Sequence, residues 1–253
     1  MTLAAALRMR DDDVVALVGG GGKTTAMFRL AGEAVERGGT AITTTTTRIF
    51  GAQIALSPAH VPAAGATREQ VSAALAAHGQ VLVIGATDAG SGKAEGVSLD
   101  LFQRLRAWCP AACILNEADG SRMRPFKAPA AYEPVIPAET TLVVALVGAD
   151  VFGRPLDADH VHRPELVSAL SGAAAGAAIT PRIVAAVLAH PEGGRKGVPA
   201  GARLVVLVNK VDRLTDPSPA RETAERLLHE PAIDSVVLAS LRGKEPVIEV
   251  CRR

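Results

Sequence analysis

Short apolar runs alternate with segments of helical periodicity along most of the chain. The apolar runs predict buried strands at 14–18, 40–46, 80–85, 112–117, 140–148, 203–208 and 235–239. The strand at 235–239 is expected to be the last strand of the chain. Helical spacing is found from Lys23 to Gly38, over 67–78, from Ser98 to Trp108, from Pro164 and over 181–190. Residues 51–66 and 171–180 are predicted to be loops. The alternation predicts an α/β fold with a doubly wound, mostly parallel sheet.

The length and composition fit one large α/β domain. The chain has 253 residues, of which 48% are hydrophobic, enough for a large buried core. We expect a single domain over 1–253, with 120–200 as a peripheral region for a substrate or partner. Aromatic residues make up only 3% of the chain and the net charge is +1. Neither nucleic acid nor an anionic membrane is therefore expected as a partner.

The cysteines and the lack of a long apolar run predict a soluble, cytoplasmic protein. Cys109, Cys113 and Cys251 are too few for a disulfide framework in a chain of this size. The N-terminal apolar run is short and precedes Arg8 and Arg10, whereas a signal peptide carries its charges first, so we predict a leading helix or turn. No stretch approaches the ~20 apolar residues of a membrane span.

The segment VVALVGGGGKTTAMF, from Val14 to Phe28, predicts a phosphate-binding loop between a strand and a helix, as in phosphate-loop NTPases. Glycines let the backbone approach an anion, and the following helix adds free N–H donors and a partial positive charge. The residues predicted to bind GTP or ATP with Mg²⁺ are Gly19, Gly20, Gly21, Gly22, Lys23, Thr24 and Thr25. Lys23 is expected to act on the β and γ phosphates, and Thr24 to ligate Mg²⁺. The pattern is incomplete, since Leu17 stands where its first glycine would fall.

Polar residues follow two of the predicted strands. Glu117 and Asp119 come directly after a buried strand, and we predict both as catalytic and Mg²⁺-holding acids, acting directly or through water. The alternative is that they only cap a turn. Thr45, Thr46 and Arg48 end the strand predicted at 40–46. They either lie beside the Mg²⁺ and the γ phosphate or form nothing more than a strand edge.

Two further loops are predicted to contact a substrate or partner. Arg122 and Lys127 belong to the basic segment SRMRPFKAP, which meets an acidic ligand or is simply solvated. The second loop precedes the helix that begins at Pro164, and its ionisable residues are Asp157, His160, His162 and Arg163. Two histidines without a third ligand nearby do not make a zinc site. They could shuttle a proton or recognise an anionic acceptor, and the alternative is a surface loop.

The strand predicted at 203–208 leads into Asn209, Lys210 and Asp212, in the N-K-x-D order with which GTPases recognise guanine. In that order the Asp accepts two hydrogens from the base, while the Asn and Lys support the ring and the phosphate loop. These three residues are therefore predicted to bind the nucleotide and to favour GTP over ATP. The tripeptide ASL at 239–241 lies where GTPases often place a backbone contact to the base.

Five segments resemble YqeC-type accessory proteins of selenium-dependent molybdenum hydroxylases: LVGGGGKTT, ITTTTTRIF, NEADGSRMRPFKAPAAYEPVIP, LVGADVFGRPLDADHVHRPEL and VLVNKVD. The resemblance runs from about Asp13 to Asp212. It implies a phosphate-loop NTPase that helps to mature a molybdenum enzyme, with that client or its cofactor as partner. It does not supply the reaction, and the sequence also leaves a homodimer open.

Three functions are open at this point. The protein is a nucleotide-hydrolysing switch in enzyme maturation, a phosphoryl or nucleotidyl transferase acting on a cofactor precursor, or a scaffold that holds nucleotide without turnover. The N-K-x-D segment favours a GTPase-like switch over a kinase. No arginine finger or catalytic glutamine stands at a fixed position, which is compatible with slow hydrolysis.

Overall fold

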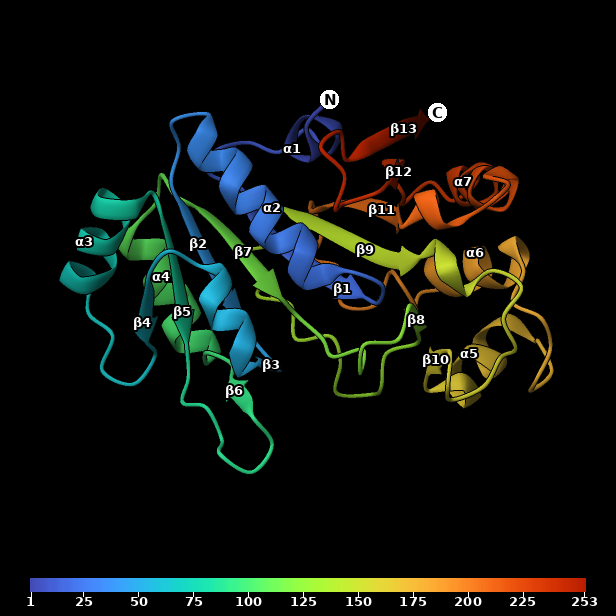
Figure 1. The fold of residues 1–253 in the computed structure, drawn as a ribbon, viewed down its shortest axis with the longest axis horizontal. Coiled ribbons are helices and arrows are strands. Elements are labelled where there is room, and N and C mark those ends of the chain that lie inside the picture. The colour runs from blue at the N-terminus through green and yellow to red at the C-terminus, as the bar shows by residue number, and fades with distance from the viewer.

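The computed structural model describes residues 1–253 and is built around one nine-stranded sheet (Figure 1). The strand order is β13-β12-β11-β9-β1-β7-β2-β5-β4, and every neighbouring pair is parallel except β12 with β13. The strands are Val14–Gly19 (β1), Ala41–Thr45 (β2), His60–Pro62 (β4), Gln80–Ile84 (β5), Cys113–Glu117 (β7), Leu142–Gly148 (β9), Arg203–Asn209 (β11), Ser235–Ala239 (β12) and Val247–Arg252 (β13). The predicted α/β fold with a mostly parallel sheet is confirmed, and the arrangement is consistent with double winding.

Alternate residues of the central strands contribute to hydrophobic layers on opposite faces of the sheet. Ala16 of β1 and Val143 of β9 belong to one buried cluster, whereas Leu17 and Val144 belong to another. Strands that are buried on both faces carry near-continuous runs of apolar side chains. The continuous apolar runs in the sequence therefore coincide with these strands.

Helices cover both faces (Figure 1). The helices over one face are α1 (Leu3–Ala6) and α2 (Lys23–Glu36). Those over the other face are α3 (Arg68–His78), α4 (Leu99–Trp108), α6 (Pro181–Ala189) and α7 (Ser218–Leu228). The helix α5 (Pro164–Ser171) packs against α6. None of these helices is both long and apolar enough to cross a lipid bilayer.

Several helix starts agree with the sequence signals. The Ser98 hydroxyl accepts from the Leu101 N–H at 3.2 Å, and Thr180 caps α6 by accepting from Ile183 N–H at 3.4 Å. Such caps satisfy backbone donors that the first helical turn leaves free. The predicted helices after Ser98 and Thr180 are confirmed.

Two predictions about secondary structure are wrong. The strand at 235–239 is not the last, because β13 follows it and pairs antiparallel with it at the sheet edge. β13 is half-exposed, so its sequence lacks the apolar run that marks a buried strand. Residues 51–66 are not only loop, since they contain the 3₁₀ helix η1 (Gly51–Leu56) and the short edge strand β4.

Short strand pairs and 3₁₀ turns lie outside the main sheet. β3 (Arg48–Phe50) pairs with β6 (Lys93–Glu95), and β8 (Phe126–Lys127) pairs with β10 (Val161–His162). The 3₁₀ turns η2 (Ala149–Val151) and η3 (Val211–Arg213) follow β9 and β11. The range 120–200 thus contains β9, deep in the sheet, together with elements beside it, and its role as a region for a substrate or partner stays a prediction.

The carboxyl ends of the parallel strands meet at one edge of the sheet. The register places Glu117 of β7 beside Thr45 of β2, and Asn209 of β11 beside Gly148 of β9. Gly19, at the end of β1, lies between β7 and β9. Open α/β sheets bind their ligands at this edge, and most of the predicted site residues gather there.

Candidate functional site

The glycine loop, Gly19 to Gly22, joins the end of β1 to the start of α2. Gly21 and Gly22 have φ angles of +81° and +137°, a region that residues with a Cβ rarely adopt. A Cβ on Gly21 would overlap the backbone of Gly148, and one on Gly22 would overlap the side-chain amide of Asn209. The loop is therefore confined between the ends of β9 and β11, and its glycines are required by backbone shape and by space.

Lys23, the first residue of α2, is buried beside the glycine loop. Its Nζ donates to the Gly19 carbonyl at 2.6 Å and lies 3.2 Å from an Asp119 oxygen and 3.6 Å from a Glu117 oxygen. Asp119 also accepts from the Gly19 N–H at 3.0 Å. Burial disfavours the charged amine, but Asp119 and Glu117 outweigh it and raise the pKa of Lys23. A desolvated cation is thus held at the start of the glycine loop.

Thr24 and Glu117 present two oxygen atoms at the same edge. Thr24 Oγ1 donates to Glu117 Oε2 at 2.8 Å and accepts from Gln53 Nε2 at 3.2 Å. Burial raises the pKa of Glu117, against opposing effects of Lys23 and Thr24. No group of three or more His, Cys, Asp or Glu side chains is arranged to hold a metal ion by itself. The pair fits Mg²⁺, which takes one or two ligands from the protein and completes its shell with water and phosphate oxygens.

Asn209, at the end of β11, links two loops. Its Nδ2 donates to the Gly21 carbonyl at 2.7 Å, and its Oδ1 accepts from the Leu241 N–H at 3.0 Å. Asn209 is buried, so both bonds are shielded from water. The side chain fixes the glycine loop relative to the segment that follows β12.

The other two residues of the N-K-x-D segment also have partners. The Asp212 carboxylate accepts from the Ser240 hydroxyl at 2.6 Å, and the Asp212 N–H donates to the same oxygen at 3.0 Å. Lys210 Nζ donates to Asp150 Oδ2 at 2.7 Å rather than to the glycine loop. Asp212 is exposed to a cavity at this edge of the sheet and keeps oxygen lone pairs free for a further donor.

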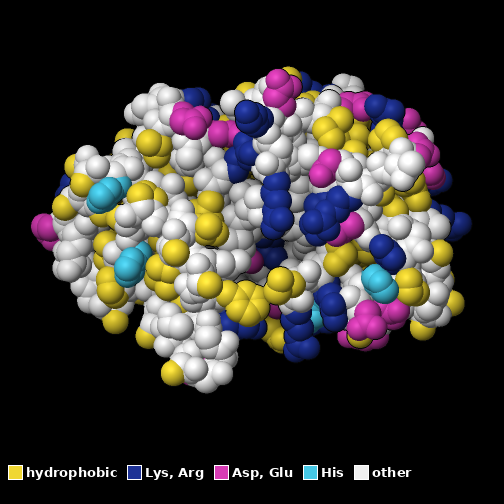
Figure 2. Space-filling view, viewed as in Figure 1, with side chains coloured by type: hydrophobic (Ala, Val, Ile, Leu, Met, Phe, Trp, Pro, Cys, Tyr) yellow, Lys and Arg dark blue, Asp and Glu magenta, His cyan; other side chains and the backbone are white.

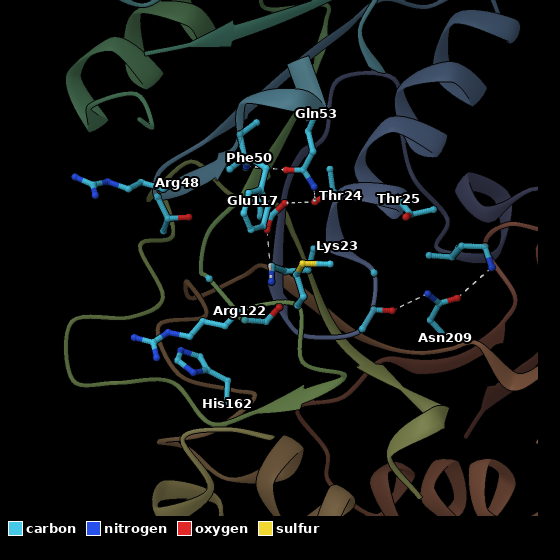
Figure 3. A pocket seen from close by; sticks show the side chains of 18 of the residues that line it. Lys23, Thr24, Thr25, Arg48, Phe50, Gln53, Glu117, Arg122, His162 and Asn209 are labelled. Atoms are coloured by element: carbon cyan, nitrogen blue, oxygen red, sulfur yellow. Dashed lines mark hydrogen bonds and ion pairs between the residues drawn. The ribbon is translucent and has the colours of Figure 1, made fainter. Parts of the chain in front are cut away.

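A cavity of about 900 Å³ runs along this edge of the sheet. In Figure 3, Asn209 lies on one side of Lys23, while Arg48, Arg122 and His162 lie on the other. Eight Lys and Arg side chains line the cavity against three from Asp and Glu. Figure 2 shows Lys and Arg side chains gathered in a dark-blue band near the middle of this face. This excess of positive charge favours an anionic ligand.

The cavity has two ends, which different strand ends and loops supply. The Asn209 end consists of Asn209, Lys210, Asp212, Arg213, Leu241 and Arg242. The Arg122 end consists of Arg48, Phe50, Lys93, Arg122, Met123, Tyr132, His162 and Arg163. The residues from Gly21 to Thr25, with Glu117, line the cavity between them. Predicted site residues from distant parts of the sequence thus share one cavity.

A chain of ion pairs starts at the buried Asp119 and ends at Arg163, which lines the Arg122 end. Lys127 Nζ lies 3.0 Å from Asp119 and 2.6 Å from Glu133, and Arg163 lies 2.7 Å from Glu133. Burial opposes ionisation of Glu133, but Arg163 and Lys127 lower its pKa to about 2. Lys127, predicted to contact a substrate, does not line the cavity, because its amine is used within this chain of charges.

The pairing of β8 with β10 brings the two predicted substrate loops together. Its register puts Lys127 beside His162, and Figure 3 shows His162 next to Arg122. Burial, followed by the charges of Arg163, Lys127 and Arg122, lowers the pKa of His162 to about 4. The imidazole is therefore neutral near pH 7 and adds a hydrogen-bonding group to a cationic wall.

Asp157 and His160 lie apart from the cavity. His160 Nδ1 is 2.8 Å from Asp157 Oδ1, and the His160 N–H donates to the same oxygen at 3.1 Å. This hydrogen bonding lowers the pKa of Asp157. Of the four ionisable residues of the predicted loop, only His162 and Arg163 therefore line the cavity.

The residues at the end of β2 have mixed roles. Thr45 is buried and donates to the Glu117 carbonyl at 2.7 Å, which fixes the two strand ends together. Thr46 lines the cavity and donates to the Val135 carbonyl at 2.7 Å. Arg48 also lines the cavity and has only a loose contact with Glu95, at 3.5 Å.

Several residues of the site were not predicted from the sequence, among them Phe50, Lys93 and Met123 at the Arg122 end. Gln53 reaches Thr24 from η1, a segment without a periodic pattern. Tyr132 and Glu133 approach Arg163 from a proline-rich stretch, with the Tyr132 hydroxyl 3.2 Å from the guanidinium. Their signal was the isolated Tyr-Glu pair between prolines, since an acid in an apolar segment needs a partner.

The fold and cavity define an α/β protein with a mostly parallel sheet and a basic site at its carboxyl edge. The family model of the YqeC protein matches residues 15–165. The chain therefore belongs to the YqeC family. A curated relative from Escherichia coli (strain K12), described as uncharacterized protein YqeC, is 34% identical over 122 residues. That match spans about half of either chain, 48% of each.

Proposed function

We propose that this protein is a Mg²⁺-dependent, guanine-nucleotide-binding protein of the phosphate-loop class that hydrolyses GTP slowly. The observation that carries the proposal is the single cavity that contains both the residues from Gly21 to Thr25 and the segment from Asn209 to Asp212. One half is typical of sites for phosphates and the other of sites for guanine. A nucleotide bound along the cavity would contact both halves.

The phosphate half rests on three observations. The glycine loop leads into the N-terminus of α2, whose free N–H groups and partial positive charge favour an anion. Lys23 is a buried cation that could exchange its carboxylate partners for phosphate oxygens. Thr24 and Glu117 supply the two protein oxygens for a Mg²⁺ that would neutralise charge on the β and γ phosphates.

The guanine half rests on Asp212 and Asn209. Asp212 is a carboxylate at the cavity that accepts one hydrogen bond from Ser240 and could accept from the guanine N1 and N2 hydrogens. Asn209 connects the glycine loop to the segment at Leu241. The Asn209 side chain would then help to position both the phosphates and the base of a bound nucleotide.

Slow hydrolysis follows from the groups near the expected γ phosphate. Lys23 would stabilise the charge of the transferred phosphoryl group. Gln53, the glutamine in the cavity, is engaged with Thr24 and accepts from the Phe50 N–H at 3.1 Å, so it is not free to orient a water molecule. We propose that a partner accelerates the reaction, as expected for a switch.

The accessory role comes from the resemblance of the sequence segments. We propose that the protein acts in the cytoplasm during maturation of a selenium-dependent molybdenum hydroxylase, with that enzyme or its cofactor as the partner. A second candidate is a transferase acting on a cofactor precursor. It is favoured by the Arg122 end, which extends the cavity beyond the region of Lys23.

Calorimetric titration of Mg-GTP and Mg-ATP tests the proposal. Each charge-assisted hydrogen bond is worth about 1.5–3 kcal/mol, so Lys23→Ala should weaken Mg-GTP binding by roughly one to two orders of magnitude. Lys244→Ala is the matched control, because Lys244 is exposed and does not line the cavity. Equal affinities of wild type and Lys23→Ala, or no binding of Mg-GTP at all, would refute the nucleotide site. Glu117→Gln should reduce the Mg²⁺ dependence of turnover, because Glu117 is one of the two residues proposed to bind the ion.

A further inference from the structure

The Arg122 end of the cavity contains cations that the protein itself leaves without strong partners. Arg122 makes no hydrogen bond or ion pair within the chain, and Arg48 has only its 3.5 Å contact with exposed Glu95. Lys93 Nζ lies over the Phe50 ring at 5.2 Å from its centre and forms no ion pair. Three positive groups therefore line the same cavity, and an anion there would have no carboxylate partner to displace from Arg122 or Lys93.

The same end also exposes large apolar side chains, among them two aromatic rings. The chain has only seven aromatic residues, one Trp, one Tyr and five Phe. The two that are exposed, Phe50 at 40% and Tyr132 at 75%, both line the Arg122 end, as does Met123 at 81%. Exposed aromatic rings next to cations indicate a ligand with both an apolar face and a negative charge.

The backbone at this end is held in an unusual conformation. Arg122 and Met123 have φ angles of +49° and +62°, in the left-handed region that residues with side chains rarely adopt. Two such residues in succession cost free energy and persist only where the surroundings hold them. Nearby, Lys127 donates to the Gly120 carbonyl at 2.7 Å, which fixes the start of this loop. The loop thus presents Arg122 and Met123 to the cavity without being a flexible tail.

We propose that the Arg122 end binds a second ligand beside the nucleotide, namely a small molecule that carries a flat ring and a phosphate group. The ring would stack on Phe50 and contact Met123, while the phosphate would meet Arg122 and Lys93. The inference rests on the proposed function for the location of the nucleotide and names the class of its neighbour. A molecule held there is next to the expected γ phosphate and is the substrate of the transferase candidate.

His162 supplies a spectroscopic signal for such a ligand. Its neighbours Arg163, Lys127 and Arg122 are cationic, and Glu133 is the acid that opposes them. A phosphate bound at this end would add negative charge and so raise the pKa of His162 from about 4. A titration of the imidazole resonances by NMR, with and without ligand, reads this shift.

The test uses flavin mononucleotide, riboflavin and inorganic phosphate as probes, titrated into the full chain after saturation with Mg-GDP. Flavin fluorescence anisotropy reports binding of the two flavins, and phosphate is added as a competitor. Flavin mononucleotide should bind at least tenfold more tightly than riboflavin, because only it carries the phosphate. Arg122→Ala should remove that advantage, and Phe50→Ala should weaken both flavins. Arg104→Ala, a surface arginine on α4 outside the cavity, should change nothing.

The possible results separate the two proposals. Failure of Mg-GDP to bind would overturn the proposed function. Binding of Mg-GDP without binding of flavin mononucleotide would overturn the second site alone. Equal affinities for the two flavins, or an unchanged affinity in Arg122→Ala whose Mg-GDP binding is normal, would also overturn it. A raised pKa of His162 in the ternary mixture would support it.

Discussion

The two ends of the cavity differ in how their polar side chains are satisfied. At the Asn209 end, Asn209, Lys210 and Asp212 all have protein partners at 2.6–3.0 Å. At the Arg122 end, Arg122 has none and Lys93 rests on a ring. Preformed hydrogen bonds hold a site in one geometry, whereas free cations remain available to a ligand. Asn209, Lys210 and Asp212 therefore form a rigid recognition site, whereas Arg122 and Lys93 remain available to a ligand.

The ion pairs of Glu133 with Lys127 and Arg163 should contribute more to stability than Arg122 or Lys93, which have no ion pair within the chain. Glu133→Gln would leave Lys127 and Arg163 without their shared counterion, and breaking a buried pair in this way costs about 3–5 kcal/mol. We expect that loss in denaturant unfolding. Glu192→Gln, on the surface, is the control, since its ion pair with Lys196 is exposed at the acid.

The same residue predicts a pH dependence. The pKa of Glu133 is about 2 in the folded protein, below its ordinary value of 4.5. The unfolded chain binds a proton more readily, so the stabilisation by Glu133 is fully present above pH 4.5 and is lost as the pH falls towards 2. As the pH falls over this range, the free energy of unfolding should decrease more steeply for the wild type than for Glu133→Gln. Parallel curves would mean that Glu133 is not ionised in the folded state.

Asn209→Ala tests the rigidity of the opposite end. It leaves the Gly21 carbonyl and the Leu241 N–H without their partner, at a cost of about 1–3 kcal/mol for each buried group. We expect lower stability together with at least a tenfold loss of Mg-GTP affinity. Asn209→Asp keeps the acceptor for Leu241 and loses the donor to Gly21, so it separates the two bonds. If affinity is unchanged in both variants, Asn209 is not what fixes the glycine loop for a ligand.

Much of this architecture was predictable, because parallel strands buried on both faces require continuous apolar runs. The ends of those runs then located Glu117 and Asn209 at one edge. β13 was missed because a half-exposed edge strand has no such run. The separation of His160 from His162 depends on the pairing of β10 with β8 and on a local hydrogen bond to Asp157, and neither is apparent in sequence spacing.

The internal role of Lys127 was equally hidden. In the sequence it belongs to a basic loop, and cations in loops are usually solvated. Its acceptors, Asp119 and Glu133, come from segments that only the tertiary fold brings together. Buried ion pairs between distant segments leave no periodic signal.

Asp212→Asn should change which base is preferred, with a smaller effect on overall affinity. An asparagine amide donates where the carboxylate accepts, so guanine loses its acceptor and the preference for GTP over ATP should fall by about tenfold, or 1.4 kcal/mol. Xanthine has a carbonyl at C2 in place of the amino group, so xanthosine triphosphate should bind the variant better than the wild type. Competition titrations with the three nucleotides measure both changes. No gain for xanthosine triphosphate would indicate that Asp212 does not face the base.

The smallest effect on stability is expected for Arg122→Ala. Arg122 is exposed and without a partner, and alanine has the same difficulty as arginine at its φ of +49°, so the strain of the loop is unchanged. The free energy of unfolding should change by no more than about 0.5 kcal/mol, which for a chain of this size moves Tm by roughly 1–2 °C. Arg163→Ala, which removes a partner of Glu133, should lower Tm by several times more. A calorimetric Tm for Arg122→Ala as low as that of Arg163→Ala would make Arg122 part of the framework, and the contrast between the two ends of the cavity would fail.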